Sequence, residues 1–329
     1  MESNIKLTYI QPPQAKITCV FQDDQLRSEI ERSAGDQSVL PDAAVYYSMP
    51  VRFPRASDTR PYIISSIVLS ADGKMAFMDN KVGPLIAQCN NLDPVGGELD
   101  FWCLNMLRAY SDALFIGANT LKNEPEGINY CMDQRLFQQR QKVLGKPNHP
   151  VQIVVSLDGT DIPFEHPSFY VDPSERLKLC IATSPSGWET IQKNSPHRHT
   201  VLGPFRNRAE VDAVPLPDLA AEFHVFPVIV TGQEAVPDME LMLYVLRRVG
   251  IELACSESPT YCGALMKNGF LDEYFINYSM LYAGGTMSPG AIFPMSWQSH
   301  PHAQLASIGV HGNGFLFTRQ LIRYGICKK

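Results

Sequence analysis

Three short segments of the sequence place small and polar residues directly after apolar, β-branched runs. They are Ser70-Ala71-Asp72-Gly73-Lys74, Gly117-Ala118-Asn119-Thr120 and Ser256-Glu257-Ser258-Pro259-Thr260. In an open α/β sheet, ligands bind beyond the carboxyl ends of the strands, so each segment is a candidate part of one binding site. The third segment leads into an expected helix, whose first backbone N–H groups are available to bind a phosphate.

Each of these segments also has a purely structural interpretation. Residues 72–74 are commonly only a turn, Thr120 is a plausible helix N-cap, and Ser258 before Pro259 is a common helix start. The fingerprints of dinucleotide loops, P-loops, nucleophile elbows and metalloprotease helices are all absent from the sequence. The three segments therefore become evidence for a site only in combination.

The cysteines and histidines form no metal-binding pattern. No two of the eight cysteines are separated by two residues, so zinc ribbons and zinc fingers have no support. Several cysteines lie in apolar runs, as Cys180 does, which indicates buried, reduced thiols in a cytoplasmic protein. The pairs His197/His199 and His300/His302 lie in proline-rich segments and are expected to be solvated. We therefore expect no metal ion.

Composition narrows the class of function further. The chain has 329 residues, of which 45% are hydrophobic and 19% charged, and this excludes disorder as the main state. A net charge of −6 argues against a broad nucleic-acid-binding face. No apolar run approaches the roughly 20 residues that cross a bilayer, and the start has no signal-peptide pattern. These features predict a cytoplasmic protein that binds neither membranes nor nucleic acid.

Strand and helix patterns alternate through the middle of the chain. Helices are expected where apolar residues recur with a 3.6-residue period or where caps mark the ends, and strands where β-branched or apolar residues run together. The expected strands are 61–70, 112–117, 151–156, 177–183, 226–232, 251–257 and 272–280, and the expected helices are 98–109, 238–249 and 259–268. Two final strands flank Asn313-Gly314, a strong hairpin signal. The pattern predicts an α/β fold with a central mixed, mostly parallel sheet flanked by helices and a C-terminal antiparallel hairpin.

Several of these segments, taken in order, resemble the reductase half of the bacterial riboflavin-biosynthesis deaminase/reductase family. They are PYIISSIVLSADGKMA, LRAYSDALFIGANTLKNEP, the strand–Pro-Thr–helix junction and GFLDEYFINYSMLYAGG, and the resemblance covers about 60–126 and 226–290. It implies a dihydrofolate-reductase-like fold with NADPH as the cofactor. It also implies an activity like that of the 5-amino-6-(5-phosphoribosylamino)uracil reductase of riboflavin biosynthesis.

The resemblance also implies roles for individual residues. NADPH would be bound by Ala76, Gly117, Thr120, Ser258, Pro259, Thr260 and Gly263. The substrate would be bound by Arg108 and Glu124, while Asp72, Lys74 and Glu257 are candidates for the catalytic groups. The implied cofactor-binding role of the junction before Pro259 also has a physical basis, because a helix N-terminus stabilises an anion such as a pyrophosphate.

The sequence departs from this family mainly where the substrate would bind. Ser256-Glu257-Ser258 stands where the family has Glu-Gly-Gly or Glu-Ala-Gly, and Asn123-Glu124-Pro125 stands where it has Asp-Asp-Pro. No basic residue occurs between Lys122 and Arg135, where the family has an arginine near the ribose phosphate. The zinc-binding strings of the deaminase half are absent. The substrate is therefore expected only to be a small heterocycle or a sugar derivative.

Two other functions stay open. The altered 256–258 segment is compatible with a non-catalytic ligand-binding protein on the same fold, and a folate- or pterin-type reductase is a further alternative. The domain organisation is expected to be an N-terminal arm, 1–60, followed by one reductase domain, 61–329, with proline-rich insertions or long loops near 127–150 and 184–224. The apolar C-terminal hairpin favours a homodimer or, equally well, a buried core strand.

Overall fold

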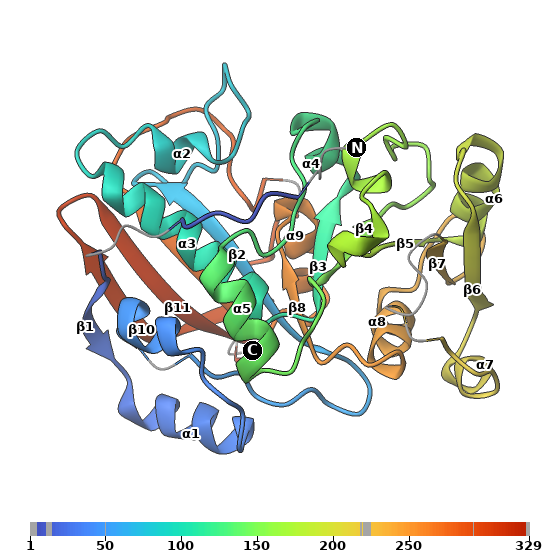
Figure 1. The fold of residues 1–329 in the computed structure, drawn as a ribbon, viewed down its shortest axis with the longest axis horizontal. Coiled ribbons are helices and arrows are strands. Elements are labelled where there is room, and N and C mark those ends of the chain that lie inside the picture. Colours follow the sequence, from blue (N-terminus) through green and yellow to red (C-terminus); the bar gives the residue numbers. More distant parts are fainter. Residues whose placement is uncertain are drawn as a thin grey trace.

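The computed structural model describes residues 5–10, 15–49, 51–217, 219, 225–291 and 293–326. In this part of the chain, eleven strands form one sheet with the order β1-β10-β11-β9-β2-β8-β3-β4-β5-β7-β6 (Figure 1). The strands are β1 (Thr18–Gln22), β2 (Tyr62–Ser70), β3 (Ala113–Gly117), β4 (Val151–Val155), β5 (Leu179–Thr183), β6 (His199–Phe205), β7 (Phe226–Thr231), β8 (Leu253–Ser256), β9 (Glu273–Ser279), β10 (His302–His311) and β11 (Phe315–Arg323).

The expected mixed sheet is confirmed. Strands β9, β2, β8, β3, β4, β5, β7 and β6 are parallel, and β1, β10, β11 and β9 pair antiparallel. The central strands are apolar on both sides, because Leu114 and Ile116 of β3 enter one core while Phe115 enters the other. The hairpin expected around Asn313 connects β10 to β11.

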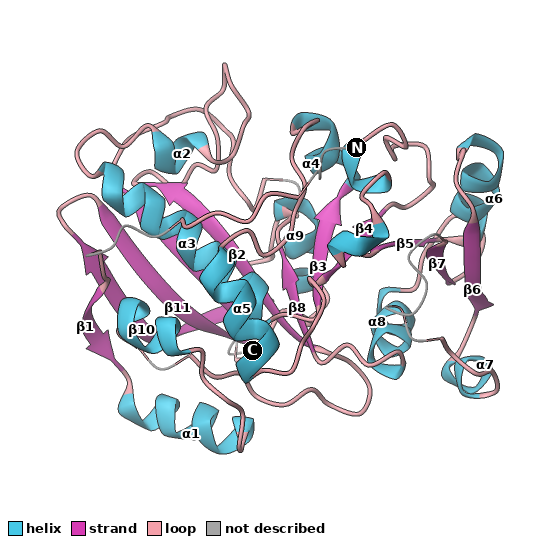
Figure 2. Ribbon diagram, viewed as in Figure 1, coloured by secondary structure: helices cyan, strands magenta, loops and turns pink. Residues whose placement is uncertain are grey.

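Helices cover both faces of this sheet (Figure 2). Helix α3 packs beside α5 across one face, and α8 and α9 belong to the core on the other. The longer helices are α1 (Asp24–Ala34), α3 (Pro94–Tyr110), α5 (Gln134–Val143), α6 (Pro185–Asn194), α8 (Met239–Arg248) and α9 (Pro259–Lys267). The shorter helical segments are η1 (Ala43–Tyr47), α2 (Leu85–Gln88), α4 (Ala118–Asn123), η2 (Pro167–Phe169), η3 (Pro173–Glu175) and α7 (Arg208–Asp212).

Helix α3 begins one turn earlier than its periodicity indicated. The Asp93 side chain accepts a hydrogen bond from the Gly96 amide, and Pro94 occupies the first turn, where no amide donor is needed. The imidazole of His311, at the end of β10, lies 2.9 Å from Asp93 Oδ2. The C-terminal hairpin therefore fixes the start of the helix that carries part of the site.

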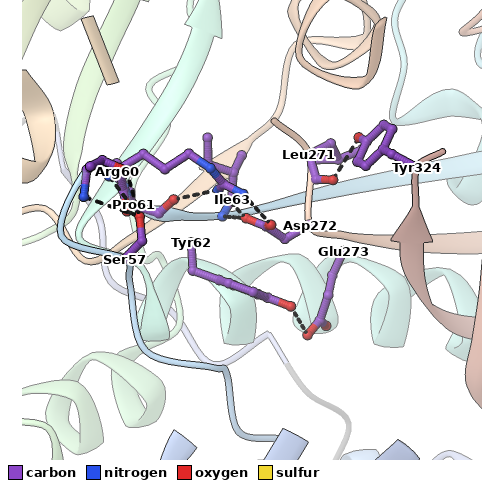
Figure 3. A network of polar contacts seen from close by, with 10 residues as sticks. Ser57, Arg60, Pro61, Tyr62, Ile63, Leu271, Asp272, Glu273 and Tyr324 are labelled. Atoms are coloured by element: carbon purple, nitrogen blue, oxygen red, sulfur yellow. Dashed lines mark hydrogen bonds and ion pairs between the residues drawn. The ribbon is translucent and has the colours of Figure 1, made fainter. Parts of the chain in front are cut away.

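The N-terminal segment is built into the main core. Strand β1 pairs with β10 at the sheet edge, and Leu40, Val51 and Phe53 are all buried within the core that α3 covers. The segment that leads into β2 is fixed by Arg60, whose guanidinium forms two 2.7 Å hydrogen bonds to the Asp272 carboxylate (Figure 3). The described residues between 15 and 60 are thus continuous with the sheet.

The two proline-rich segments contain more regular structure than expected. Residues 184–224 were expected to form a long loop, but they include α6, the edge strand β6 and α7. A strand at the sheet edge needs only one hydrogen-bonded neighbour, so β6 pairs with β7 while its Pro204 has no amide to donate. Residues 127–150 include α5, which starts after the N-cap Asp133. Among the described residues, no helix is long and apolar enough to span a membrane.

Candidate functional site

A cleft of about 1960 Å³ runs along the carboxyl ends of the parallel strands. Residues at or just after the ends of β3, β4, β5, β7 and β8 contribute to its lining, and one face of α3 closes it above β2. This is the edge at which open α/β sheets bind ligands. The α3 residues that line it, Gly97, Asp100, Phe101, Leu104 and Arg108, follow the helical period.

The structure brings most of the predicted site residues into this one cleft. The predicted residues that line it are Ala76, Arg108, Gly117, Thr120, Glu124, Glu257, Ser258, Pro259 and Thr260. They come from separate regions of the chain between residues 76 and 260, so the shared location is a property of the fold and not of sequence proximity. Their individual roles remain predictions.

Asp72, Lys74 and Gly263 lie outside the lining of the cleft. The Asp72 carboxylate accepts hydrogen bonds from the Ser70 hydroxyl and from the amides of Ala283 and Gly284. These bonds lower the pKa of Asp72 to about 2, and the bond from Ser70 has the largest effect. Its position fits a turn that holds two loops together. Lys74 belongs to the same turn and donates its amide to Ser70 Oγ.

Gly263 faces a loop. A Cβ placed there would lie 2.9 Å from the Phe293 ring, so the space beside Gly263 is filled by protein. Phe293 itself lines the cleft. Gly263 thus supports the cleft wall from behind.

The β3–α4 and β8–α9 turns approach each other closely at the centre of the cleft. A Cβ at Gly117 would lie 2.7 Å from Ser258 Oγ, which explains why a residue without a side chain ends β3. Ser258 is the N-cap of α9, and its Oγ accepts a hydrogen bond from the Tyr261 amide. The Ser258 hydroxyl therefore binds an amide of the first turn of its own helix.

One local expectation at this point is wrong. Thr120 was expected to be a helix N-cap, but Gly117 occupies that position and Thr120 lies inside α4. The Gly117 backbone is extended, and the helix begins directly after the strand at Ala118. Thr120 is still close to the turn, because its Oγ1 lies 3.6 Å from where a Cβ of Gly117 would be.

A buried ion pair joins α3 to the turn before α9. Arg108 Nε and Nη2 each lie 2.7 Å from a Glu257 carboxylate oxygen, and Arg108 Nη1 donates to the Tyr130 carbonyl. Asn129 Nδ2 donates to the same carboxylate at 2.9 Å. Burial is the largest single effect on the pKa of Arg108 and lowers it, but the charge of Glu257 and its hydrogen bonds act together in the opposite direction, and the net pKa is raised. An anionic substrate group would meet a guanidinium whose charge is already balanced.

Replacing Glu257 tests how far this pair holds the site together. Glu257→Gln removes the negative charge and leaves the buried guanidinium of Arg108 without its counter-ion, so we expect a loss of about 1–3 kcal/mol in the free energy of unfolding. Urea denaturation followed by circular dichroism measures it. Glu126→Gln, an exposed position two residues after Glu124, is the control and should change stability by less than about 0.5 kcal/mol. Equal effects of the two variants would contradict a structural role for the pair.

Glu124 and Asp100 are two carboxyl groups of the cleft with raised pKa values. For Glu124, burial is the larger cause and the nearby Glu257 charge adds to it. For Asp100, burial raises the pKa to about 6, and a 2.8 Å hydrogen bond from Asn277 Nδ2 opposes this only in part. Asp100 is partly exposed to the cleft but surrounded by protein on its other sides. A carboxyl group that titrates near neutral pH is suited to donating a proton.

Asp100 is a cleft residue that sequence reasoning missed, because the expected helix 98–109 was linked to the site only through Arg108. A signal for it was present, because Asp100 shares the helical face of Leu104 and Arg108, and Arg108 was already expected to face the site. An ionisable residue on the ligand-facing side of an amphipathic helix is itself a site candidate.

No protein-family profile matches this sequence, and no curated protein sequence matches it. The fold, in contrast, is similar to that of solved structures. A pyrimidine reductase-like protein from Corynebacterium diphtheriae matches with a TM-score of 0.56 at 16% identity, over 87% of this chain and 96% of that chain. This similarity confirms the fold that the sequence resemblance implied.

Two further solved structures with riboflavin-pathway reductase names are also similar to this chain. A diaminohydroxyphosphoribosylaminopyrimidine deaminase/5-amino-6-(5-phosphoribosylamino)uracil reductase from Thermotoga maritima matches with a TM-score of 0.49 at 14% identity. That match covers 81% of this chain and 57% of the other. A riboflavin biosynthesis reductase from Saccharomyces cerevisiae matches with a TM-score of 0.43 at 13% identity, over 80% of this chain and 90% of that chain.

Proposed function

We propose that this chain is a nicotinamide-dinucleotide-dependent reductase of a small heterocyclic or sugar-derived substrate. The observation that carries the proposal is the cleft. It is large enough for a dinucleotide and a second molecule together, and it joins a helix N-terminus to an ionisable face of α3. The fold of the pyrimidine reductase-like relative supports this class of reaction. The sequence resemblance favours NADPH as the cofactor.

The residues at the centre of the cleft fit a dinucleotide. The turn at Gly117 and the α9 N-terminus at Ser258 lie close together in the cleft, and a Cβ at Gly117 would collide with the Ser258 hydroxyl. Pro259 has no amide proton and the Tyr261 amide is bound by Ser258, so the Thr260 amide and the positive end of the α9 dipole would favour a pyrophosphate there. Thr120, Pro259 and Thr260 would border the same group, and Ala76 would border the nicotinamide.

The chemistry supplied by a bound nicotinamide dinucleotide is the transfer of a hydride to a polarised C=N or C=O bond. The protein has to orient the acceptor and donate one proton. Asp100 is the proposed proton donor, because its raised pKa keeps a proton available near neutral pH. Glu124, with the Arg108–Glu257 pair beside it, would hold polar groups of the substrate.

The proposal is tested by titrating the purified protein with NADH and, separately, with NADPH. Binding should raise the melting temperature as either ligand exceeds its dissociation constant, and nicotinamide fluorescence reports it directly. Thr120→Arg places a long side chain at the proposed pyrophosphate position and should weaken binding at least tenfold without lowering the melting temperature of the free protein. The proposal is wrong if millimolar concentrations of both dinucleotides leave the melting temperature and the fluorescence unchanged.

A further inference from the structure

We infer that the half of the cleft that would bind the adenosine selects a ribose with a free 2′-hydroxyl, and so NADH over NADPH. This inference rests on the proposed function, since it concerns the cofactor of that same site. It differs from the cofactor that the sequence resemblance favours. It follows from where a dinucleotide has to lie and from which charges line that part of the cleft.

The direction of the dinucleotide follows from the placement of the site residues. Asp100 and Arg108 lie on α3, which covers the β2 side of the cleft, so the reacting ring belongs there. The pyrophosphate position lies between β8 and β3. The adenosine must then extend the other way, over the ends of β4, β5 and β7. Neighbouring strands are about 4.8 Å apart, so the adenosine ribose, one sugar beyond the pyrophosphate, reaches the ends of β4 and β5.

The described residues that line this half of the cleft include no lysine or arginine. Their charged members are all acidic: Asp161, Glu234, Asp238 and Glu240. Elsewhere in the described lining the basic residues are Lys81, which precedes α2, and Arg108, which is paired with Glu257. Sites that accept a 2′-phosphate supply an arginine for it, whereas sites that bind a free ribose supply an aspartate or glutamate.

Among these acids, Asp161 is placed best to contact a ribose. It follows β4 and accepts a hydrogen bond from the hydroxyl of Ser156, the first residue after that strand. The Ser156 Oγ in turn accepts the Gly159 amide, so the carboxylate is held in a fixed turn. Two of the other acids have different partners, because Asp238 caps α8 and Glu240 pairs with the exposed Arg208. Asp161 would accept a hydrogen bond from a 2′-hydroxyl and would repel a 2′-phosphate.

The test is a pair of dissociation constants, for NADH and for NADPH, measured by nicotinamide fluorescence on the full chain at low salt. We expect NADH to bind at least tenfold more tightly than NADPH. The difference should shrink as salt is added, because the repulsion is electrostatic and is screened. NADPH binding as tightly as NADH, or more tightly, would overturn the inference and leave the proposed function standing. If neither dinucleotide binds, both fail.

A matched pair of substitutions locates the effect. Asp161→Asn keeps the size of the side chain and its bond with Ser156 but removes the charge, and it should reduce the NADH preference at least threefold. Asp158→Asn changes an exposed acid of the same turn, three residues earlier, which lies outside the cleft lining and bonds to Thr160. It should leave the preference unchanged. If the Asp161 and Asp158 variants had the same ratio of NADPH to NADH dissociation constants, Asp161 would not be the source of the selectivity, and this role of Asp161 would be overturned.

Discussion

Glu273→Ala should destabilise the protein by about 3–5 kcal/mol, because it leaves a buried guanidinium without its counter-ion. Glu273 is fully buried on β9, and its carboxylate lies 2.7 Å from Arg319 Nε and 3.0 Å from Arg319 Nη2 on β11. The Tyr62 hydroxyl donates to the same carboxylate at 2.8 Å (Figure 3). Three neighbouring strands therefore converge on one carboxyl group.

The same ion pair connects the N-terminal segment to the sheet. Arg319 Nη2 donates to the Arg52 carbonyl at 2.6 Å, and its guanidinium lies 5.4 Å from the Phe53 ring centre and 5.6 Å from that of Phe275. Removing the carboxylate leaves this cation in an apolar setting with fewer acceptors. The loss of stability should thus include loosening of the contact between residues 51–53 and β11.

Equilibrium urea denaturation measures this loss. The matched control is Glu252→Ala, which removes an exposed carboxylate 3.9 Å from Arg247 and should cost less than about 1 kcal/mol. Limited proteolysis gives a second readout, since cleavage within residues 50–60 should become faster in the Glu273 variant than in the control. A Glu273→Ala variant as stable as the Glu252 control would show that water or a neighbouring group compensates the guanidinium.

The central strands and their mostly parallel arrangement were predictable because each of these strands carries its own signal. A strand that is covered on both faces has to be apolar at successive positions, and the run from Ala113 to Ile116 on β3 shows this locally. The N-terminal segment carries no such signal. Leu40, Val51 and Phe53 are buried singly from irregular backbone, so no period of 2 or 3.6 residues reveals them.

The site was predictable for its backbone turns and for several single side chains, such as Arg108 and Glu124, but not for how those side chains pair. Small residues after β3 and β8 pointed to the centre of the cleft from the sequence, and the structure brings those turns together. The Arg108–Glu257 pair was out of reach, because its members are 149 residues apart and were assigned separate roles, substrate binding for Arg108 and catalysis for Glu257. Which charges neutralise each other in a site depends on which residues lie close together in the folded protein, and the spacing of residues along the sequence does not reveal this.

Asp100→Asn should change stability and activity in opposite directions. Burial raises the Asp100 pKa from its ordinary value of 3.8 to about 6, so the folded protein disfavours the charged form. The stability associated with this group is fully present below pH 3.8 and is lost as the pH rises through about 6. Asparagine resembles the neutral acid and can still accept the bond from Asn277. The variant should therefore be more stable than the original protein by about 1–3 kcal/mol at pH 7.5 and equally stable near pH 4.

The activity should fall where the stability rises. If Asp100 donates the proton, reduction of a heterocyclic carbonyl or imine, followed as dinucleotide oxidation, should be about 10²- to 10⁴-fold slower in Asp100→Asn. In the original protein kcat/KM should decline as the pH rises above about 6, and this decline should be absent from the residual activity of the variant. Glu98→Gln, an exposed position on the same helix, should alter neither property. A variant that gains stability at pH 7.5 yet keeps its full rate would leave Asp100 as a buried acid without a role in proton transfer. One that loses rate without the gain in stability would refute the raised pKa on which that role depends.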